Sequence, residues 1–161
     1  MKKLIYTLLV IIALTNNSFS AGTSSDSSDS SSNYTKAKNL IKAAKKYEKK
    51  GKTEKAQKRY AKAQELLLKS NKEKPLQADT LNYLGFTSRK LGDYKKGEAF
   101  YLQGLKIEPN HNGINEYLGE LYIATNRMDL AKERLNILKS CDCKEYKQLK
   151  KIVEGTKKSK Y

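Results

Sequence analysis

The sequence has no tryptophan, one histidine and two cysteines among its 161 residues. So few catalytic and metal-ligating side chains argue against an enzyme, a metal site or a disulfide framework. Acidic residues are also scarce, because 17 Asp and Glu stand against 33 Lys and Arg, and the formal net charge is +16. The length suits one domain of ordinary size. We therefore expect a non-enzymatic protein that needs neither a cofactor nor a metal.

Long apolar runs are absent except at the amino terminus. There a short basic start precedes an apolar segment over residues 4–14, which is too short to span a bilayer as a mature helix. Ser18 and Ser20 then supply the small residues of a cleavage site before Ala21. We interpret residues 1–20 as a cleavable signal peptide, which predicts a periplasmic or secreted protein. An uncleaved amino-terminal anchor is the alternative.

The chain changes character after this segment. Residues 21–35 are dominated by Ser and Asp, and they bury too little apolar surface to offset the entropy of ordering. We predict a flexible linker there. Apolar residues with helical spacing then continue to residue 154, and residues 155–161 form a basic tail.

Two stretches of the chain share one pattern after a shift of 34 residues, from Leu84 to Leu118. The shared positions are small or large apolar residues at fixed offsets: Leu84, Gly85, Gly97, Tyr101 and Gly104 in the first stretch, and Leu118, Gly119, Ala131, Leu135 and Leu138 in the second. This spacing resembles the tetratricopeptide repeat (TPR), in which two helices cross at small residues.

The TPR resemblance implies an all-α fold, a short right-handed α-solenoid of helical hairpins with a carboxyl-terminal capping helix. We expect a repeat domain over residues 36–154, with repeats near 37–74, 78–111 and 112–140 and a capping helix at 144–154.

The first repeat is longer than the second. Ala56 precedes Gly97 by 41 residues rather than 34. The extra seven residues, about two helical turns, predict a longer second helix or a longer turn before Pro75. Gly97 and Gly104 stand where the family usually has alanine. We therefore expect Gly104→Ala to be neutral or stabilising.

The first helix of each repeat, in the TPR family, lines a concave surface that binds peptides or protein segments. Spacing from the Leu-Gly pairs predicts the groove residues Asn82, Tyr83, Phe86 and Arg89 in the second repeat, and Glu116, Tyr117 and Glu120 in the third. We expect the three aromatic rings to be exposed anchors and their polar neighbours to set orientation. Packing of these rings between repeats is the alternative.

The positive charge is concentrated in residues 36–74, where 14 Lys and one Arg against four Glu give a net of +11. Residues 75–143 are balanced. Lys38, Lys42 and Lys45 mark the predicted basic patch. Such a patch attracts an acidic protein segment or an anionic membrane surface, although a solvated lysine face is the simpler explanation. Nucleic acid is not expected, because arginine is scarce.

Cys141 and Cys143 lie between the third repeat and the capping helix. We favour a structural disulfide or a simple pair at the turn, with a redox pair or a metal site as alternatives. His111, in the turn between repeats, is expected to cap a helix or form a hydrogen bond.

The combined features predict a non-enzymatic scaffold or adaptor of the cell envelope that binds a protein or peptide. Two alternatives stay open. One is a thiol-redox or assembly factor that uses Cys141 and Cys143, and the other is a basic adaptor at a membrane surface.

Overall fold

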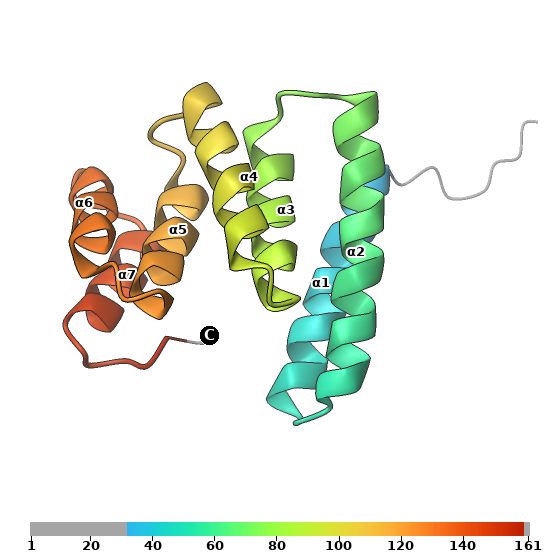
Figure 1. Ribbon diagram of the computed structural model, residues 1–161, viewed down its shortest axis with the longest axis horizontal. Helices are drawn as coiled ribbons and strands as arrows, with labels where there is room; N and C mark the ends of the chain where they lie inside the picture. The colour runs from blue at the N-terminus through green and yellow to red at the C-terminus, as the bar shows by residue number, and fades with distance from the viewer. Residues whose placement is uncertain (1–31, 160–161) are drawn as a thin grey trace, which may run out of the picture. The chain divides into compact units, whose positions relative to one another are not determined.

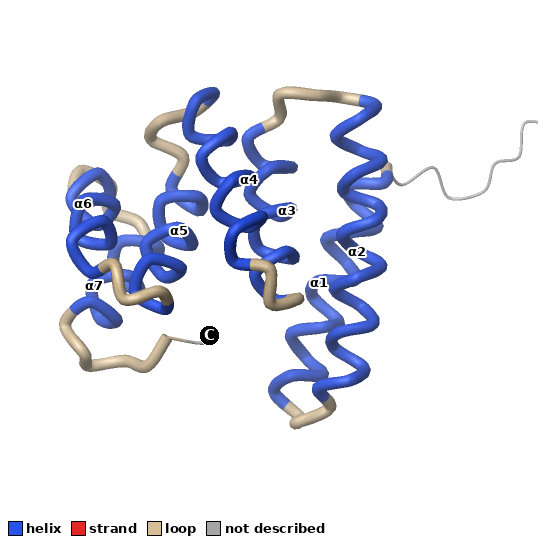
Figure 2. The backbone as a smooth tube through the Cα atoms, in the orientation of Figure 1, coloured by secondary structure: helices blue, strands red, loops and turns tan. Residues whose placement is uncertain are grey.

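The computed structural model describes residues 32–159, and all regular structure in this part of the chain is helical (Figure 2). The helices are α1 (Asn33–Lys49), α2 (Thr53–Glu73), α3 (Ala78–Lys90), α4 (Tyr94–Ile107), α5 (Asn112–Ala124), α6 (Met128–Leu138) and α7 (Lys144–Val153). The predicted all-α helical-repeat class is confirmed. The predicted signal peptide lies outside the described residues. Among residues 32–159, no helix combines the length and the apolar character that a membrane span requires.

Helices that follow one another in sequence pack as pairs. The pairs are α1 with α2, α3 with α4, and α5 with α6 (Figure 1). Successive pairs lie side by side, because α2 contacts α3 and α4 contacts α5. The last helix, α7, packs against both α5 and α6 and covers the end of the array. Each pair thus buries the apolar face that its neighbour presents.

Left-handed residues lie in the turn within each of the three helical pairs, and the first of them is Gly51, with φ of 67°, after α1. Gly92, with φ of 90°, follows α3, and Asn126, with φ of 58°, follows α5. Gly and Asn adopt this region at low cost. The carboxylate of Asp93 then accepts a hydrogen bond of 2.9 Å from the backbone N–H of Lys96, which caps α4. Local sequence therefore sets where these hairpins turn.

The extra length of the first repeat lies in its second helix. Helix α2 has 21 residues, whereas its counterpart α4 has 14. The difference equals the seven-residue excess that the sequence indicated. The helix therefore extends by about two turns, and the connection to α3 stays short.

Small residues allow the helices of the first pair to approach closely. Ala37 and Ala44 from α1 and Ala56 and Ala63 from α2 are at most 1% exposed and belong to one apolar cluster. Tyr60, which is fully buried, fills the remaining space and packs its ring edge-on against Phe86 of α3 at a centroid distance of 5.8 Å. The first pair is thereby joined to the second through aromatic contact.

Glycines take this role in the second pair, and their surroundings correct the expectation for Gly104. A Cβ atom at Gly104 would overlap the Cδ1 atom of Ile114, a fully buried residue of α5. The alanine variant therefore requires Ile114 to move, so a neutral effect no longer follows from family preference alone. At Gly97, a Cβ atom would lie 3.1 Å from the carbonyl oxygen of Gly85, which belongs to less adjustable backbone.

Candidate functional site

The odd-numbered helices α1, α3, α5 and α7 contact one another in succession and form one face of the helical unit, here called the odd-helix face. A cavity of about 540 Å³ opens on this face, and we call it the basic cavity. Its lining residues are Lys45, Glu48, Lys49, Thr53, Phe86, Lys90, Tyr117 and Gln148. A volume of this size is typical of ligand sites in proteins.

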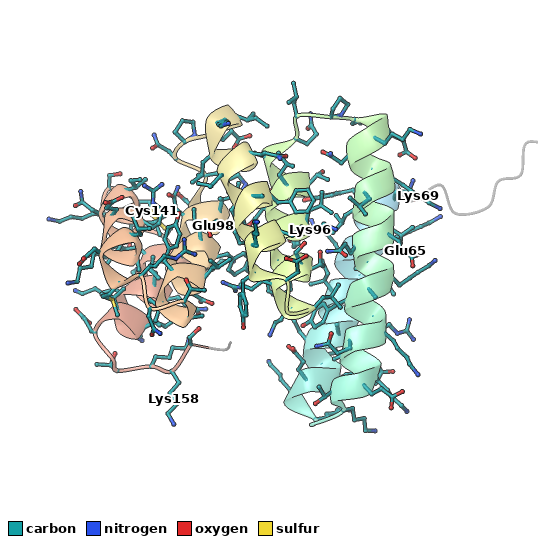
Figure 3. The ribbon with its side chains drawn as sticks, in the orientation of Figure 1. Glu65, Lys69, Lys96, Glu98, Cys141 and Lys158 are labelled. Atoms are coloured by element: carbon teal, nitrogen blue, oxygen red, sulfur yellow. A yellow bond between two sulfur atoms is a disulfide. The ribbon has the colours of Figure 1, made fainter. Side chains whose placement is uncertain are left out.

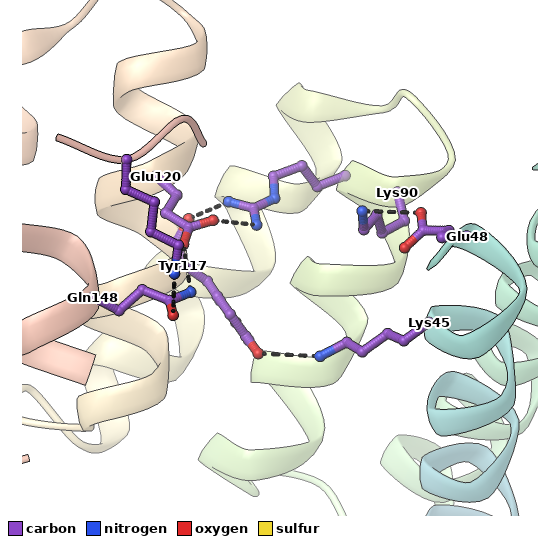
Figure 4. A network of polar contacts seen from close by, with 8 residues as sticks. Lys45, Glu48, Lys90, Tyr117, Glu120 and Gln148 are labelled. Carbon is purple, nitrogen blue, oxygen red and sulfur yellow. Dashed lines mark hydrogen bonds and ion pairs between the residues drawn. The ribbon is translucent and has the colours of Figure 1, made fainter. Parts of the chain in front are cut away.

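Two lysines in the basic cavity are held by contacts to aromatic and acidic side chains (Figure 4). The ammonium group of Lys45 lies 4.4 Å from the centroid of the Phe86 ring and 3.5 Å from the hydroxyl oxygen of Tyr117. The ammonium group of Lys90 lies 3.0 Å from a carboxylate oxygen of Glu48. Cation–π contact and ion pairing thus fix the positive charges at the cavity wall.

Arg89 of α3 and Glu120 of α5 form a buried ion pair. Neither side chain has exposed surface, and the Nη2 and Oε2 atoms are 3.3 Å apart. Arg89 also donates to the backbone carbonyl of Tyr117, and Gln148 donates to the second oxygen of Glu120 at 3.3 Å. These bonds tie α3, α5 and α7 together. Removing one member of such a pair leaves an uncompensated buried charge.

A second pocket lies beside the basic cavity and shares Tyr117 and Gln148 with it. Its volume is about 380 Å³, and we call it the acidic pocket because three of its lining residues carry carboxylates. The lining residues are Asp79, Asn82, Tyr83, His111, Gly113, Glu116, Tyr117, Lys144, Glu145 and Gln148. The odd-helix face therefore presents two pockets of different chemistry next to each other.

Glu116 has the most perturbed carboxylate of the acidic pocket. Its residue is 7% exposed. The pKa of Glu116 is raised to about 8, mainly by burial and then by the nearby carboxylates of Glu120 and Glu145, against smaller opposing effects of Lys45 and Arg89. A carboxylate with little solvent and acidic neighbours holds its proton more tightly.

His111 serves a structural role at the rim of the acidic pocket, as the sequence indicated. Its Nδ1 atom accepts a hydrogen bond of 3.1 Å from the backbone N–H of Ile114 and so caps α5. Its Nε2 atom lies 3.3 Å from a carboxylate oxygen of Asp79. Within residues 32–159, no group of three or more His, Cys, Asp or Glu residues is arranged to hold a metal ion.

The predicted groove residues are less exposed than the sequence suggested. Phe86 is fully buried, and Arg89 and Glu120 are 2% and 0% exposed. The expectation that Phe86 is an exposed anchor is wrong, because its ring packs against Tyr60 and Tyr117. Arg89 and Glu120 satisfy each other and have no surface to offer a partner. Packing between repeats, the alternative explanation for the aromatic rings, therefore describes Phe86.

The remaining predicted groove residues do line the pockets. Asn82, Tyr83 and Glu116 line the acidic pocket, and Tyr117 lines both pockets. Tyr83 and Tyr117 are half-buried, and burial raises the pKa of each tyrosine hydroxyl above its ordinary value. A partner-binding role for these residues stays a prediction.

The predicted basic patch divides into two parts. Lys38 and Lys42 are exposed, and the ammonium group of Lys38 lies 5.1 Å from the centroid of the Tyr34 ring. Lys45 turns instead into the basic cavity. Glu48, Lys49 and Lys90 complete that wall, and the sequence interpretation missed them. The charge-rich end of α1 and the end of α3 come together only when the hairpins pack.

Helix α7 contributes more than a cap. Glu145 and Gln148 reach the pockets from α7, and the sequence interpretation treated this segment only as a cover for the last repeat. Their spacing of three residues on a helix, which places side chains on one face, was the sequence signal that could have predicted them.

Cys141 and Cys143 form a disulfide in the turn before α7 (Figure 3).

Comparison with known protein families identifies one segment of the chain. Residues 78–111, which comprise α3, α4 and the turns that follow each of them, match the tetratricopeptide repeat model. This segment is a tetratricopeptide repeat. The resemblance inferred from the sequence is confirmed for this TPR, whose α3 contributes to both pockets.

Two solved structures resemble this chain over more than one repeat in length. The type III secretion translocator chaperone SycD of Yersinia enterocolitica aligns with a TM-score of 0.54 and 13% identity, over 73% of this chain and 81% of that chain. The first TPR of Spaghetti (RPAP3), bound to the HSP90 peptide SRMEEVD, aligns with a TM-score of 0.48 and 18% identity, over 76% and 94% of the two chains. No curated protein matches the sequence significantly. At such identities the likeness describes the fold.

Proposed function

We propose that this protein is a non-enzymatic scaffold that binds an extended segment of another protein on its odd-helix face. The observation that carries the proposal is the basic cavity, whose wall is built from α1, α2, α3, α5 and α7. A site formed by several repeats in a rigid array offers a long contact surface without any need for chemistry. The TPR at residues 78–111 supports a protein-interaction scaffold.

The charge of the cavity favours an acidic partner segment. Lys45, Lys49 and Lys90 line it, and residues 36–74 carry a net charge of +11. Long-range attraction by such a region raises the association rate for acidic partners and weakens with added salt. The half-buried ring of Tyr117 supplies an amphipathic contact at the floor, where an aromatic residue contributes most to affinity.

The solved neighbour with the higher TM-score supports the class of function. SycD is described as a translocator chaperone, a protein that acts on another protein.

Export is part of our proposal and rests on the predicted cleavage site before Ala21. Mass spectrometry of the protein from its native host should find a mature chain that begins at Ala21. A chain that keeps its first twenty residues would refute this part of the proposal.

The binding face can be tested with a peptide library that does not presuppose the partner. Ligands would be selected against the full chain, and binding would then be compared between Lys45→Glu/Lys49→Glu and the matched variant Lys69→Glu/Lys96→Glu. The matched lysines are exposed on the even-numbered helices α2 and α4 (Figure 3). We expect acidic ligands whose affinity falls about ten-fold or more in the first variant and stays unchanged in the second.

Two results would contradict the proposal. One is equal binding by both charge-reversed variants, because the site would then lie away from the basic cavity. The other is a set of ligands whose contacts, mapped by amide chemical shifts, fall on the even-numbered helices. Circular dichroism of each variant would separate lost binding from lost structure.

A further inference from the structure

Glu116 is a largely buried residue of the acidic pocket, and its carboxylate has no ion-pair partner within the described part of the chain. Among residues 32–159, the carboxylate of Glu116 takes part in neither a hydrogen bond nor an ion pair, although the residue is only 7% exposed. Its neighbour Glu120 differs, since Arg89 and Gln148 satisfy it. A buried charge without a partner is unfavourable, so the carboxyl group of Glu116, with a pKa of about 8, keeps its proton near neutral pH. A bound cation would favour the ionised carboxylate, and the proton would leave to solvent.

Asn82 provides an independent indication of a missing donor. It lines the acidic pocket and is 6% exposed. Its Oδ1 atom is buried and has no hydrogen-bond partner within the described part of the chain. Gly113 leaves room beside this amide, because a Cβ atom there would lie 2.8 Å from the Nδ2 atom of Asn82. A buried acceptor usually has a donor, and none of the described residues supplies it.

The spacing of the acids favours an organic cation. Asp79, Glu116 and Glu145 line one pocket together with His111, yet no three of these groups are arranged to hold a metal ion. A volume of about 380 Å³ also exceeds what a bare ion fills. An ammonium group on a flexible chain carries three N–H donors, and it can reach acceptors that are further apart.

We propose that the acidic pocket binds a primary ammonium group of the partner segment, supplied by a lysine side chain or by a free amino terminus. The ammonium donates to the carboxylate of Glu116 and to Oδ1 of Asn82, while Asp79 and Glu145 add negative charge. Lys144 also lines the pocket, but its side chain is 89% exposed and its ammonium group lies 3.8 Å from Glu145. This inference rests on the proposed binding function of the same face and names a chemical feature of its partner.

The partner segment would then carry charges of both signs. Its acidic part would face the basic cavity, and its ammonium group would enter the acidic pocket. Because Tyr117 and Gln148 line both pockets, the two features lie close together along the segment. Complementary charges at neighbouring points set the direction and the register in which the segment binds.

Short peptides of defined charge test the ammonium site directly. The probes are acetyl-Gly-Lys-Gly-amide, Gly-Gly-Gly-amide with a free amino group, and the uncharged acetyl-Gly-norleucine-Gly-amide. Nuclear magnetic resonance would follow their binding to the full chain at low salt and neutral pH. We expect one or both ammonium probes to shift the amide signals of Asn82, Gly113 and Glu145. The norleucine probe should bind about ten-fold or more weakly.

Matched variants separate a built site from general attraction. Glu116→Gln and Asn82→Ala should each weaken the bound ammonium probe several-fold, whereas Glu108→Gln, which neutralises an exposed carboxylate of equal charge, should leave it unchanged. Equal effects of all three substitutions would overturn the proposal. So would ammonium probes that shift no pocket signal, or that bind no better than norleucine.

Failure of the ammonium site can be distinguished from failure of the proposed protein-binding function. Acidic library ligands that depend on Lys45 and Lys49, combined with silent ammonium probes, would remove the ammonium site alone. A library that yields no ligand for the odd-helix face would remove the proposed function first. The ratio of the two ammonium-probe affinities identifies the preferred source, because only Gly-Gly-Gly-amide offers an amino terminus.

Discussion

The two pockets on the odd-helix face carry opposite charges although they lie side by side. The basic cavity is lined by three lysines and the acidic pocket by three carboxylates, and both border on Tyr117 and Gln148. Two of the three lysines, Lys45 and Lys49, belong to the basic first hairpin. The acidic pocket, in contrast, takes two of its carboxylates from residues 75–143, where acidic and basic residues are equal in number. Segment charge therefore predicts one pocket and not the other.

Burial of a single ion pair explains much of this difference. Arg89 forms an ion pair with Glu120 inside the protein, so its positive charge does not reach the pocket surface. Glu116, one helical turn before Glu120, is left without such a partner and contributes to the acidic pocket. In the folded protein, Arg89 and Glu120 neutralise each other in the interior, and Glu116 remains as an acidic group of the pocket.

The largest expected effect comes from breaking the buried pair of Arg89 and Glu120. Arg89→Met leaves Glu120 buried and uncompensated, and it should lower the free energy of unfolding by roughly 3–5 kcal/mol. Urea unfolding monitored by circular dichroism measures this loss. The double variant Arg89→Met/Glu120→Met should be more stable than the single variant, because no isolated charge remains. A double variant that loses the sum of both single losses would show that the pair is not coupled.

The next largest effect is the contribution of Glu116 to the pH dependence of the free energy of unfolding. Its pKa in the folded protein is about 8, against 4.5 as the ordinary value. The folded state thus binds more protons between these values, and the free energy of unfolding falls as pH rises through this window. The slope from this group is at most about 1.4 kcal/mol per pH unit.

Replacement of Glu116 should remove this slope. We expect Glu116→Gln to be more stable than the wild type near pH 8 and similar to it near pH 4.5, because a glutamine side chain has no proton to lose. Chemical unfolding at several pH values measures the difference. The exposed Glu108→Gln is the control and should run parallel to the wild type. Parallel curves for Glu116→Gln as well would show that this carboxylate titrates normally.

The smallest effect concerns Tyr117, which both pockets share. Tyr117→Phe keeps the ring that packs on Phe86 but removes the hydroxyl that accepts a long hydrogen bond of 3.5 Å from Lys45. Because this bond is long and partly exposed, its loss should cost about 0.5 kcal/mol in thermal unfolding. The matched Tyr83→Phe should be close to neutral. A loss above about 2 kcal/mol would show that the hydroxyl has a structural role beyond this contact.

Periodicity was sufficient for the fold because it reflects local packing rules. The Leu-Gly pairs and small residues at a fixed interval predicted helical pairs, and residues 78–111 are a TPR. Gly92 and Asn126, both with positive φ, follow the ends of α3 and α5. The excess length before Gly97 was found in α2, which leaves only a short connection to α3. These features depend on interactions within one repeat or between adjacent repeats.

The candidate site was predicted only in part, because exposure depends on neighbours. Spacing placed Phe86 on the correct face of α3, yet it could not show that Tyr60 and Tyr117 close over the ring. Spacing also gave no reason to pair Arg89 with Glu120 rather than with Glu116. Lys90 and Gln148 entered the site from positions that carried no motif. Each miss involves side chains from different repeats.

The sequence by itself determined the helices, their pairing, the unequal repeat lengths and the basic character of the first hairpin. Helical spacing, turn residues and small crossing residues act over distances of a few residues, so they can be recognised in the sequence alone. Only the tertiary structure decided which charges are neutralised inside and which face a pocket. The reason is that the energy of a charge depends on its burial and on partners that packing brings within a few ångströms, from helices as far apart in sequence as α1, α3, α5 and α7.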